Sequence, residues 1–189
     1  MSKKGIAIFV SGRGSNAAAI LERESAFHFT VNLIVVSNKN APAITLAQRY
    51  NIPYLILDKS TFPHSTEILD LLQKHQVAVI CLAGFLWKIP DYLIQEYPNN
   101  IINIHPSLLP KYGGKGMYGM KVHEAVIANQ EKYSGLTIHL VNEEYDKGKV
   151  LFQTKIAIED DEKPDALARR ILSLEHQYFA QVIDAHCQG

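Results

Sequence analysis

The sequence has little cysteine, no net charge and no long apolar run, and each absence narrows what the chain can do. Its two cysteines, Cys81 and Cys187, lie far apart, which argues against a disulfide framework and indicates a reducing, cytoplasmic setting. Nineteen basic residues balance nineteen acidic ones, so neither nucleic acid nor a membrane surface is an expected partner. No segment reads as a membrane span, and the first five residues lack the apolar core of a signal peptide. The eight histidines show no HExxH or CxxC spacing, so no metal site is expected.

Short, unbroken apolar runs alternate with helical patterns in the first half of the chain. The runs that predict strands lie at 5–10, 31–36, 54–57, 77–83 and 101–105, and the segments that predict helices lie at 17–21, 42–50 and 67–75. Apolar strands separated by helices are typical of a parallel sheet with helices on both faces. We therefore predict an α/β fold with a mostly parallel, twisted sheet.

The second half of the chain changes character. A glycine-rich loop at 111–116 leads into a helix at 121–128, and two strands at 137–141 and 150–154 flank a turn, which predicts an antiparallel addition to the sheet. Pro164 opens a last helix, whose expected core stripe is Leu167, Ile171, Leu174, Tyr178 and Val182. No linker or repeat interrupts the chain, so residues 1–189 are expected to form a single domain.

The segment from Asn103 to Pro110 (Asn-Ile-His-Pro-Ser-Leu-Leu-Pro) places an amide and an imidazole two residues apart at the end of an apolar run. Alternate residues of a strand share a face, so Asn103 and His105 point the same way, and Pro106 ends the strand. A neutral donor beside a group that titrates near pH 7 suits a reaction that builds charge on a carbonyl oxygen. A strand end at which both side chains satisfy local backbone groups is the open alternative.

The loop from Ser11 to Asn16 joins the first strand to the first helix. Backbone N–H groups at a helix N-terminus favour an anion such as phosphate, and Ser15 and Asn16 can either cap the helix or bind a ligand. An ordinary capped turn is the alternative. The spacing of Gly12, Gly14 and Ala17 half-matches a dinucleotide fingerprint, but 37–39 (Ser-Asn-Lys) holds no carboxylate for a ribose, which disfavours NAD.

Other candidates are weaker when each is taken alone. A turn aspartate such as Asp146 usually binds backbone, and a strand histidine such as His139 is more often packed than catalytic. Glu175 lies beside the apolar stripe of the last helix and needs a partner, which a ligand can supply. Phe85 and Trp87 follow a strand end, where they form either an aromatic wall for a flat ligand or part of the core.

Together these residues resemble the folate-dependent formyltransferases over nearly the whole chain. The matching motifs lie at 11–16, 37–39, 82–85, 103–112 and 135–139, with Asp146 and 175–176. The loop at 11–16 narrows the resemblance to the branch that serves purine synthesis. It implies a Rossmann-like formyltransferase fold and direct transfer of a formyl group from 10-formyltetrahydrofolate, a co-substrate, to the amine of glycinamide ribonucleotide. No metal is implied, small molecules are the partners, and the protein is expected to be a monomer or homodimer.

The resemblance also implies roles for individual residues. Three match the family's catalytic trio: Asn103, His105 and Asp146. Three match the loop that binds the ribonucleotide phosphate: Gly14, Ser15 and Asn16. A fourth, Glu175, matches the acid that contacts the body of the ribonucleotide. Four follow the folate pocket beside Asn103: Leu86, Trp87, Lys88 and Ile89. A protonated His105 is expected, with its pKa raised by Asp146.

The chain departs from the family pattern at 87–88, 113–119 and 147–149, none of which touches the trio. Other branches stay open as alternatives. A tRNA-directed enzyme is expected to carry a further C-terminal domain, a formyl-folate deformylase an extra N-terminal one, and a sugar-nucleotide enzyme a different phosphate loop. From another class, a non-catalytic nucleotide- or folate-binding module is the alternative, which a turnover assay separates.

Overall fold

A seven-stranded sheet runs through the molecule in the strand order β3-β2-β1-β4-β5-β6-β7 in the computed structural model, which describes residues 3–189. The strands are β1 (Lys4–Val10), β2 (Phe29–Val36), β3 (Tyr54–Ile56), β4 (Val77–Leu82), β5 (Ile101–His105), β6 (Tyr133–Leu140) and β7 (Val150–Ala157). β1 to β5 pair in parallel, while β5–β6 and β6–β7 pair antiparallel. The predicted mixed sheet with an antiparallel C-terminal side is confirmed.

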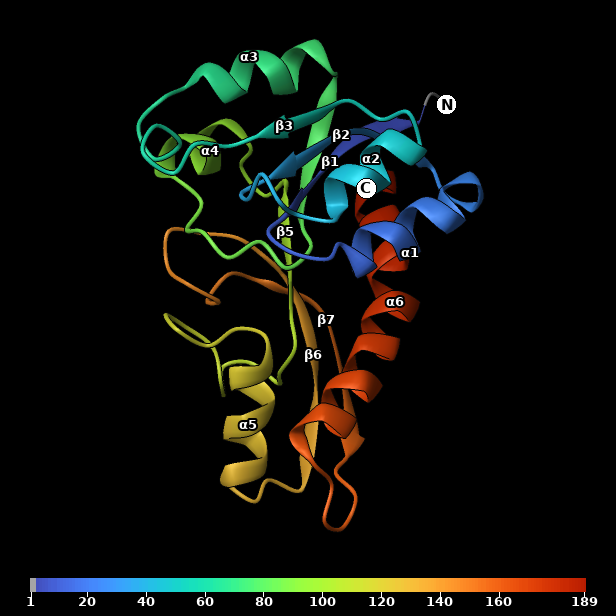
Figure 1. Ribbon diagram of the computed structural model, residues 1–189, viewed down its shortest axis with the longest axis vertical. Coiled ribbons are helices and arrows are strands. Elements are labelled where there is room, and N and C mark those ends of the chain that lie inside the picture. The colour runs from blue at the N-terminus through green and yellow to red at the C-terminus, as the bar shows by residue number, and fades with distance from the viewer. Residues whose placement is uncertain (1–2) are drawn as a thin grey trace.

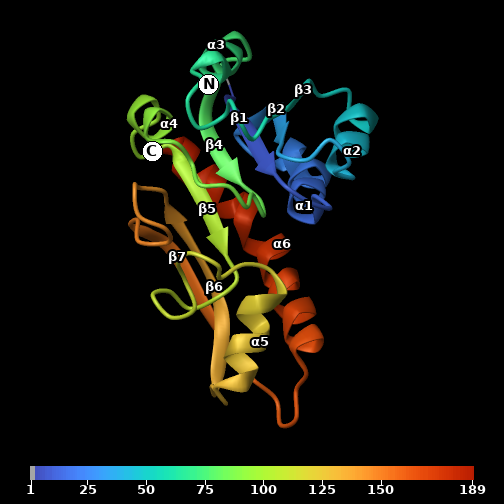
Figure 2. The same cartoon turned by 60° about the vertical axis from the view of Figure 1, so that its left-hand side comes forward.

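Helices cover both faces of the sheet (Figures 1 and 2). They are α1 (Ser15–Arg23), α2 (Ala43–Arg49), α3 (Glu67–Lys74), α4 (Asp91–Glu96), α5 (Met120–Ala128) and α6 (Pro164–Gln188), with a short 3₁₀ turn, η1 (Glu24–Ala26). The side chains of α1, α2, α5 and α6 fill one face, and those of α3 and α4 the other. α4 has only six residues and no predicted counterpart.

The two cores are separated by the alternation of side chains along the central strands. In β1, Ile6, Ile8 and Val10 join the core under α6, whereas Ala7 and Phe9 join the core under α3. All five are at most 1 % exposed. A strand buried on both faces is apolar throughout, which is the pattern that the sequence showed.

The buried row of α6 differs from the predicted stripe. Leu167 and Ile171 are buried as expected, but the row continues through Glu175, Phe179 and Ile183. The other predicted members, Leu174, Tyr178 and Val182, are half-buried and only pack against this core. The second half of the predicted stripe was wrong because Glu175 interrupts the apolar residues of the row that is buried. The uninterrupted apolar pattern continues in the neighbouring row, which the prediction followed.

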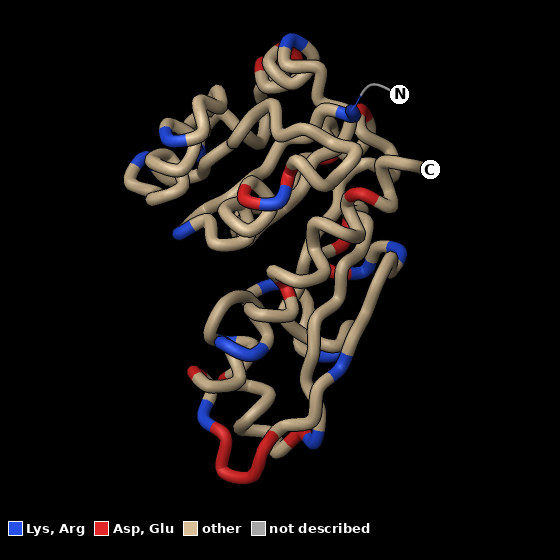
Figure 3. Tube along the Cα trace, turned by 90° about the vertical axis from the view of Figure 1, so that its right-hand side faces the viewer, with Lys and Arg blue, Asp and Glu red and all other residues tan. Residues whose placement is uncertain are grey.

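Charges of both signs are interspersed along most of the trace (Figure 3). The exception is the loop between β7 and α6, where four acidic residues follow one another at 159–162. α6 is the longest helix of the part described, and neither it nor any other helix there is apolar over enough residues to cross a membrane.

Candidate active site

The carboxyl ends of β1, β4 and β5 border one cavity of about 670 Å³. Ligands of open α/β sheets bind at this edge, because the loops that leave neighbouring strands separate there. Most of the wall of the cavity comes from five segments far apart in the sequence, at 12–16, 82–89, 103–106, 114–120 and 141–146, and single residues of α5, β6 and α6 complete it. The cavity therefore joins the two motif regions, the N-terminal glycine loop and the end of β5.

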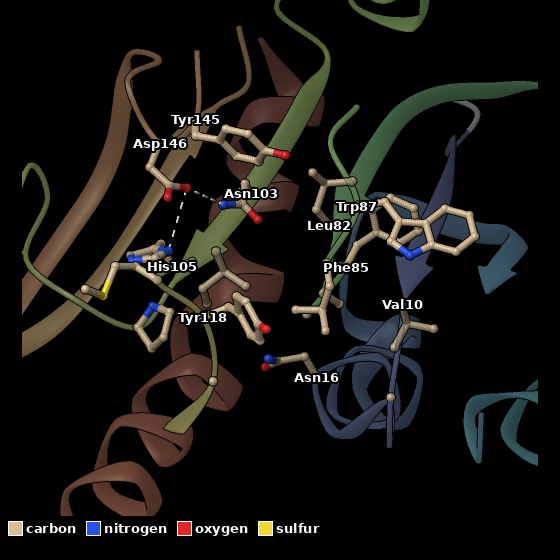
Figure 4. A pocket seen from close by; sticks show the side chains of 18 of the residues that line it. Val10, Asn16, Leu82, Phe85, Trp87, Asn103, His105, Tyr118, Tyr145 and Asp146 are labelled. Carbon is tan, nitrogen blue, oxygen red and sulfur yellow. Dashed lines mark hydrogen bonds and ion pairs between the residues drawn. The ribbon is translucent and has the colours of Figure 1, made fainter. Parts of the chain in front are cut away.

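Asn103 and His105 occupy the end of β5 and both line this cavity. Their shared orientation follows from strand alternation, since Ile104 between them packs into the core under α6. His105 is only 5 % exposed. In Figure 4 both side chains extend toward the same carboxylate, that of Asp146.

Asp146 reaches the strand end from the loop between β6 and β7. Its Oδ1 lies 3.4 Å from Asn103 Nδ2 and 3.7 Å from His105 Nδ1. Its Oδ2 accepts a hydrogen bond of 2.8 Å from the Gly114 amide, and its backbone φ of 55° is a conformation that aspartate tolerates. The structure thus brings together the three residues of the predicted trio.

His139 is the packed, hydrogen-bonded strand histidine that the sequence indicated, being 2 % exposed, and it also belongs to the same cluster. Its Nδ1 lies 2.8 Å from the Leu140 carbonyl oxygen, so Nδ1 carries the proton. Nε2 then accepts from Asn103 Nδ2 at 3.1 Å and lies 3.5 Å from Asp146 Oδ1. His139 therefore fixes the rotation of the Asn103 amide, so that its N–H groups face the cluster.

The charge balance of the cluster is set by burial and by Asp146. Burial lowers the pKa of His105 below its ordinary value, although Asp146 and the hydrogen bond with the Tyr112 carbonyl both raise it. At Asp146, burial raises the pKa, but the two imidazoles and the Gly114 amide outweigh it and leave the pKa below its ordinary value. Asp146 thus acts on His105 in the expected direction, but burial is the larger influence and the pKa of His105 lies below its ordinary value. The imidazolium of the reacting complex stays a prediction.

A second polar pair lies across the cavity, between Asn16 at the start of α1 and Glu175 of α6. Asn16 Nδ2 donates 2.7 Å to Glu175 Oε2, so the partner that Glu175 was expected to need is Asn16. Burial raises the pKa of Glu175 to about 7, against the opposing effect of that hydrogen bond. The Oδ1 atom of Asn16 is buried without a protein partner, which leaves an acceptor for a ligand.

The N-terminal glycine loop keeps the free amides that an anion site needs. Gly14 is the N-cap of α1 at φ 75°, and a Cβ there would lie 3.0 Å from Ala43 Cβ. No side chain caps the helix, so the alternative that Ser15 or Asn16 does so is wrong. The first N–H groups of a helix have no partner within it, and they lie here beside the cavity, which Ser15 and Asn16 line.

The segment 86–89 lines the opposite wall of the cavity. Leu86 is 51 % exposed, and its N–H donates to Ser11 Oγ at 2.9 Å. The Trp87 ring lies 5.9 Å from the ring of Phe62 and 6.1 Å from that of Phe85, while both Phe85 and Trp87 border the cavity. Both alternatives for Phe85 and Trp87 therefore apply: the two rings pack on the core, and they also form an apolar wall of the cavity.

His123 of α5 also lines the cavity and was not singled out from the sequence. It is 5 % exposed, and burial lowers its pKa to about 4, so it is neutral at pH 7. A lone histidine on an apolar helix face gives no signal of this placement. Within residues 3–189, no group of His, Cys, Asp and Glu is arranged to hold a metal ion.

Comparison with known proteins agrees with this geometry. Residues 4–183 match the formyl transferase family. The chain is 41 % identical over 193 residues to "Phosphoribosylglycinamide formyltransferase, chloroplastic" of Arabidopsis thaliana. That alignment covers 98 % of this chain and 66 % of the plant protein. It is 34 % identical over 186 residues to the Bacillus subtilis phosphoribosylglycinamide formyltransferase, covering 95 % of this chain and 93 % of that one.

Among solved structures, glycinamide ribonucleotide transformylase 1 from Geobacillus kaustophilus superposes with a TM-score of 0.90 at 31 % identity. The alignment covers 98 % of this chain and 99 % of that one. The chain therefore spans just under two thirds of the plant relative and nearly the whole length of these two bacterial proteins.

Proposed function

The chain belongs to the formyl transferase family, and from this premise we propose that it transfers a formyl group from 10-formyltetrahydrofolate to the amine of glycinamide ribonucleotide, a step of purine synthesis. The observation that carries the proposal is the cluster of Asn103, His105 and Asp146. This cluster lies in a cavity that has the N-terminal glycine loop on one wall and the segment 86–89 on the other. The resemblance assigned these same residues to the reaction.

The proposed binding mode uses the two walls of the cavity. The ribonucleotide phosphate lies on the amides of Gly14, Ser15 and Asn16, and Glu175 contacts the body of the ribonucleotide. The folate lies along the segment 86–89, between the exposed Leu86 and the Trp87 ring. Both substrates then reach the end of β5, where the amine and the formyl carbon meet.

The proposed reaction is direct transfer. The amine attacks the formyl carbon, a C–N bond forms, and the carbonyl electron pair moves onto the formyl oxygen. One Asn103 amide N–H stays on His139, and the other, which makes only the long 3.4 Å contact with Asp146, can donate to this oxygen without any rotation of the amide. A fixed donor of this kind commonly contributes a factor of about 10²–10³ in rate.

His105 and Asp146 handle charge and proton in this proposal. The oxyanion adds a second negative charge beside His105, which raises the pKa of the imidazole against the lowering effect of burial. The imidazole takes a proton from water, stabilises the oxyanion as the imidazolium, and returns the proton to water when the carbonyl re-forms. Asp146 accepts the proton that leaves the attacking amine, directly or through water, and passes it to the folate nitrogen as the bond from that nitrogen to the formyl carbon breaks. No covalent intermediate with the protein forms.

The same premises support the remaining proposals. The formyl donor is a folate that acts as co-substrate, and we propose no metal. We propose a monomer or homodimer of one domain, without nucleic-acid or membrane partners. The cytoplasm is the proposed compartment, on the basis of two buried, unpaired cysteines; the plant relatives bear chloroplastic names.

The test is formyl transfer from 10-formyltetrahydrofolate to glycinamide ribonucleotide by the purified chain and by His105→Ala. We expect turnover by the wild type and a loss of at least about 100-fold in the variant, because charge stabilisation is lost. His64→Ala, at an exposed histidine outside the cavity, is the matched control. A folded wild type that binds both substrates without turnover would instead make the chain a binding module.

A further inference from the structure

Tyr112 has an unusual backbone conformation for its residue type. Seven non-glycine residues of the described chain have positive φ, and six of them are Asn, Asp or Gln: Asn51, Gln76, Asn99, Gln130, Asp146 and Asp161. The seventh is Tyr112 at φ 57°. A bulky side chain in this region is strained, and such strain persists only where surrounding contacts enforce it.

The contacts that enforce it come from the Tyr112 side chain and from the preceding residue. The phenol donates to Glu131 Oε1 at 2.9 Å, and Lys111 Nζ donates to the same oxygen at 2.8 Å. On the other side, Ser107 Oγ donates to the Lys111 carbonyl at 2.7 Å. Glu131 lies beyond the end of α5 and has only 25 % of its side chain exposed, so this anchor connects the loop to a separate element.

The strained peptide of Tyr112 makes a direct contact with His105 in the candidate active site. The Tyr112 carbonyl oxygen lies 2.8 Å from His105 Nε2. A carbonyl can only accept, so Nε2 carries the proton and Nδ1 of the neutral imidazole is left without one. Nδ1 then faces Asp146 Oδ1 at 3.7 Å, so the Tyr112 carbonyl fixes which ring atom meets the reacting groups.

We propose that Glu131 and the Tyr112 phenol are positioning residues for His105: they hold the strained Tyr112 peptide, whose carbonyl fixes the imidazole with its proton on Nε2. This inference rests on the proposed function only in giving His105 a part in the reaction. Neither Glu131 nor the Tyr112 phenol lines the cavity. Both therefore act through His105 rather than on a substrate.

The first test observes His105 directly, without turnover. Protein labelled with ¹⁵N-histidine is compared by NMR for wild type, Tyr112→Phe and Glu131→Ala, with Tyr133→Phe as a matched control because that phenol is half exposed and belongs to β6. We expect neutral wild-type His105 to be protonated on Nε2, and the two test variants to show a mixture of both tautomers. Wild-type His105 protonated mainly on Nδ1, or variant spectra identical to the wild type, would overturn the proposal.

The second test is kinetic and separates positioning from folding. We expect Tyr112→Phe and Glu131→Ala each to lower kcat about tenfold with KM for both substrates within about twofold, and the double variant to lose no more than either single one. Glu131→Gln keeps an oxygen that can accept from the phenol, so it should restore most of kcat. Additive losses in the double variant, or a Glu131→Gln as poor as Glu131→Ala, would refute the shared anchor. If the folded wild type bound both substrates without any formyl transfer while the tautomer still depended on Glu131, the proposed function would fail and the anchor would stand.

Discussion

At the residue scale, the charge on Asp146 and the protonation of His105 are coupled. Asp146 is the strongest influence that raises the pKa of His105 against the lowering effect of burial. Asp146→Asn keeps an oxygen for the Gly114 amide but removes the charge, so the pKa of His105 should fall further. We expect kcat to fall at least about 100-fold with a smaller change in substrate affinity.

An NMR titration of the His105 ring in both proteins measures this coupling. Asp161→Asn is the matched control, because Asp161 has nearly the same backbone φ, 56°, on an exposed loop. An unchanged imidazole pKa in Asp146→Asn would contradict the coupling, whatever happens to kcat.

Glu175 makes a separate prediction about stability. The folded protein holds this carboxyl protonated up to about pH 7, against an ordinary value of 4.5, chiefly because it is buried. Between these values the folded state binds more protons than the unfolded state, so the free energy of unfolding decreases as pH rises through this window. The loss amounts to roughly 3 kcal/mol if the unfolded side chain has its ordinary pKa.

Glu175→Gln should abolish that loss. Urea unfolding at pH 4.5 and pH 8 should show the variant gaining stability relative to wild type at the higher pH, while it binds the ribonucleotide more weakly. Glu124→Gln, at an exposed glutamate of α5, is the comparison. Equal pH dependence in Glu175→Gln and wild type would show that the carboxyl is not held protonated by the fold.

The shared face of Asn103 and His105 could be predicted from the sequence, but the contact of His139 with Asn103 could not. Two residues on one strand share a face by simple alternation, and Pro106 marks where the strand ends. His139 meets Asn103 only through the antiparallel register that pairs these two residues across β5 and β6. That register depends on the length of the connection between the strands, which residue patterns do not define.

At the element scale, the sequence predicted the elements that show a clear period and missed those fixed by tertiary packing. The apolar central strands were recognisable because both of their faces are buried. α4 is a six-residue helix without a full amphipathic period, and the buried row of α6 passes through Glu175. Both features follow from what these helices pack against, which is information beyond the local sequence.

The loop between β5 and α5 is the element expected to move. Four of the nine residues from Tyr112 to Met120 are glycines, so ordering it costs conformational entropy. Its residues 114–120 line the cavity beside the predicted catalytic residues. Loops in this position often close over a ligand and exclude water. We therefore expect the part of the loop after Tyr112 to be mobile in the free protein and ordered with a bisubstrate mimic.

Limited trypsin digestion measures that ordering at Lys115 and Lys121. Cleavage at these sites should be fast in the free protein and slow in the complex. Lys59, an exposed lysine outside the cavity, provides an internal reference whose cleavage should not respond to ligand. Equal rates with and without ligand would make the loop a passive connection.

At the scale of the whole molecule, the two cores share the same strands and are therefore expected to unfold together. Alternate residues of β1, β2, β4 and β5 belong to the two cores in turn, so neither core survives the loss of the other's strands. Leu136, Ile138 and the buried row of α6 connect the C-terminal half to the core under α6. This arrangement supports the proposal of one domain over residues 1–189.

The single tryptophan allows that proposal to be tested across the sheet. Trp87 packs against the core under α3 and α4, whereas Ile183 of α6 lies fully buried in the opposite core. Ile183→Ala should lower the free energy of unfolding by about 2–5 kcal/mol. Because unfolding is expected to be cooperative, Trp87 fluorescence and far-UV circular dichroism should show the same shift in urea midpoint. Leu174→Ala, at a half-buried position of the same helix, is the control and should shift the two midpoints less. A variant in which the dichroism transition moves while the Trp87 transition stays at its wild-type midpoint would show two separately folding units.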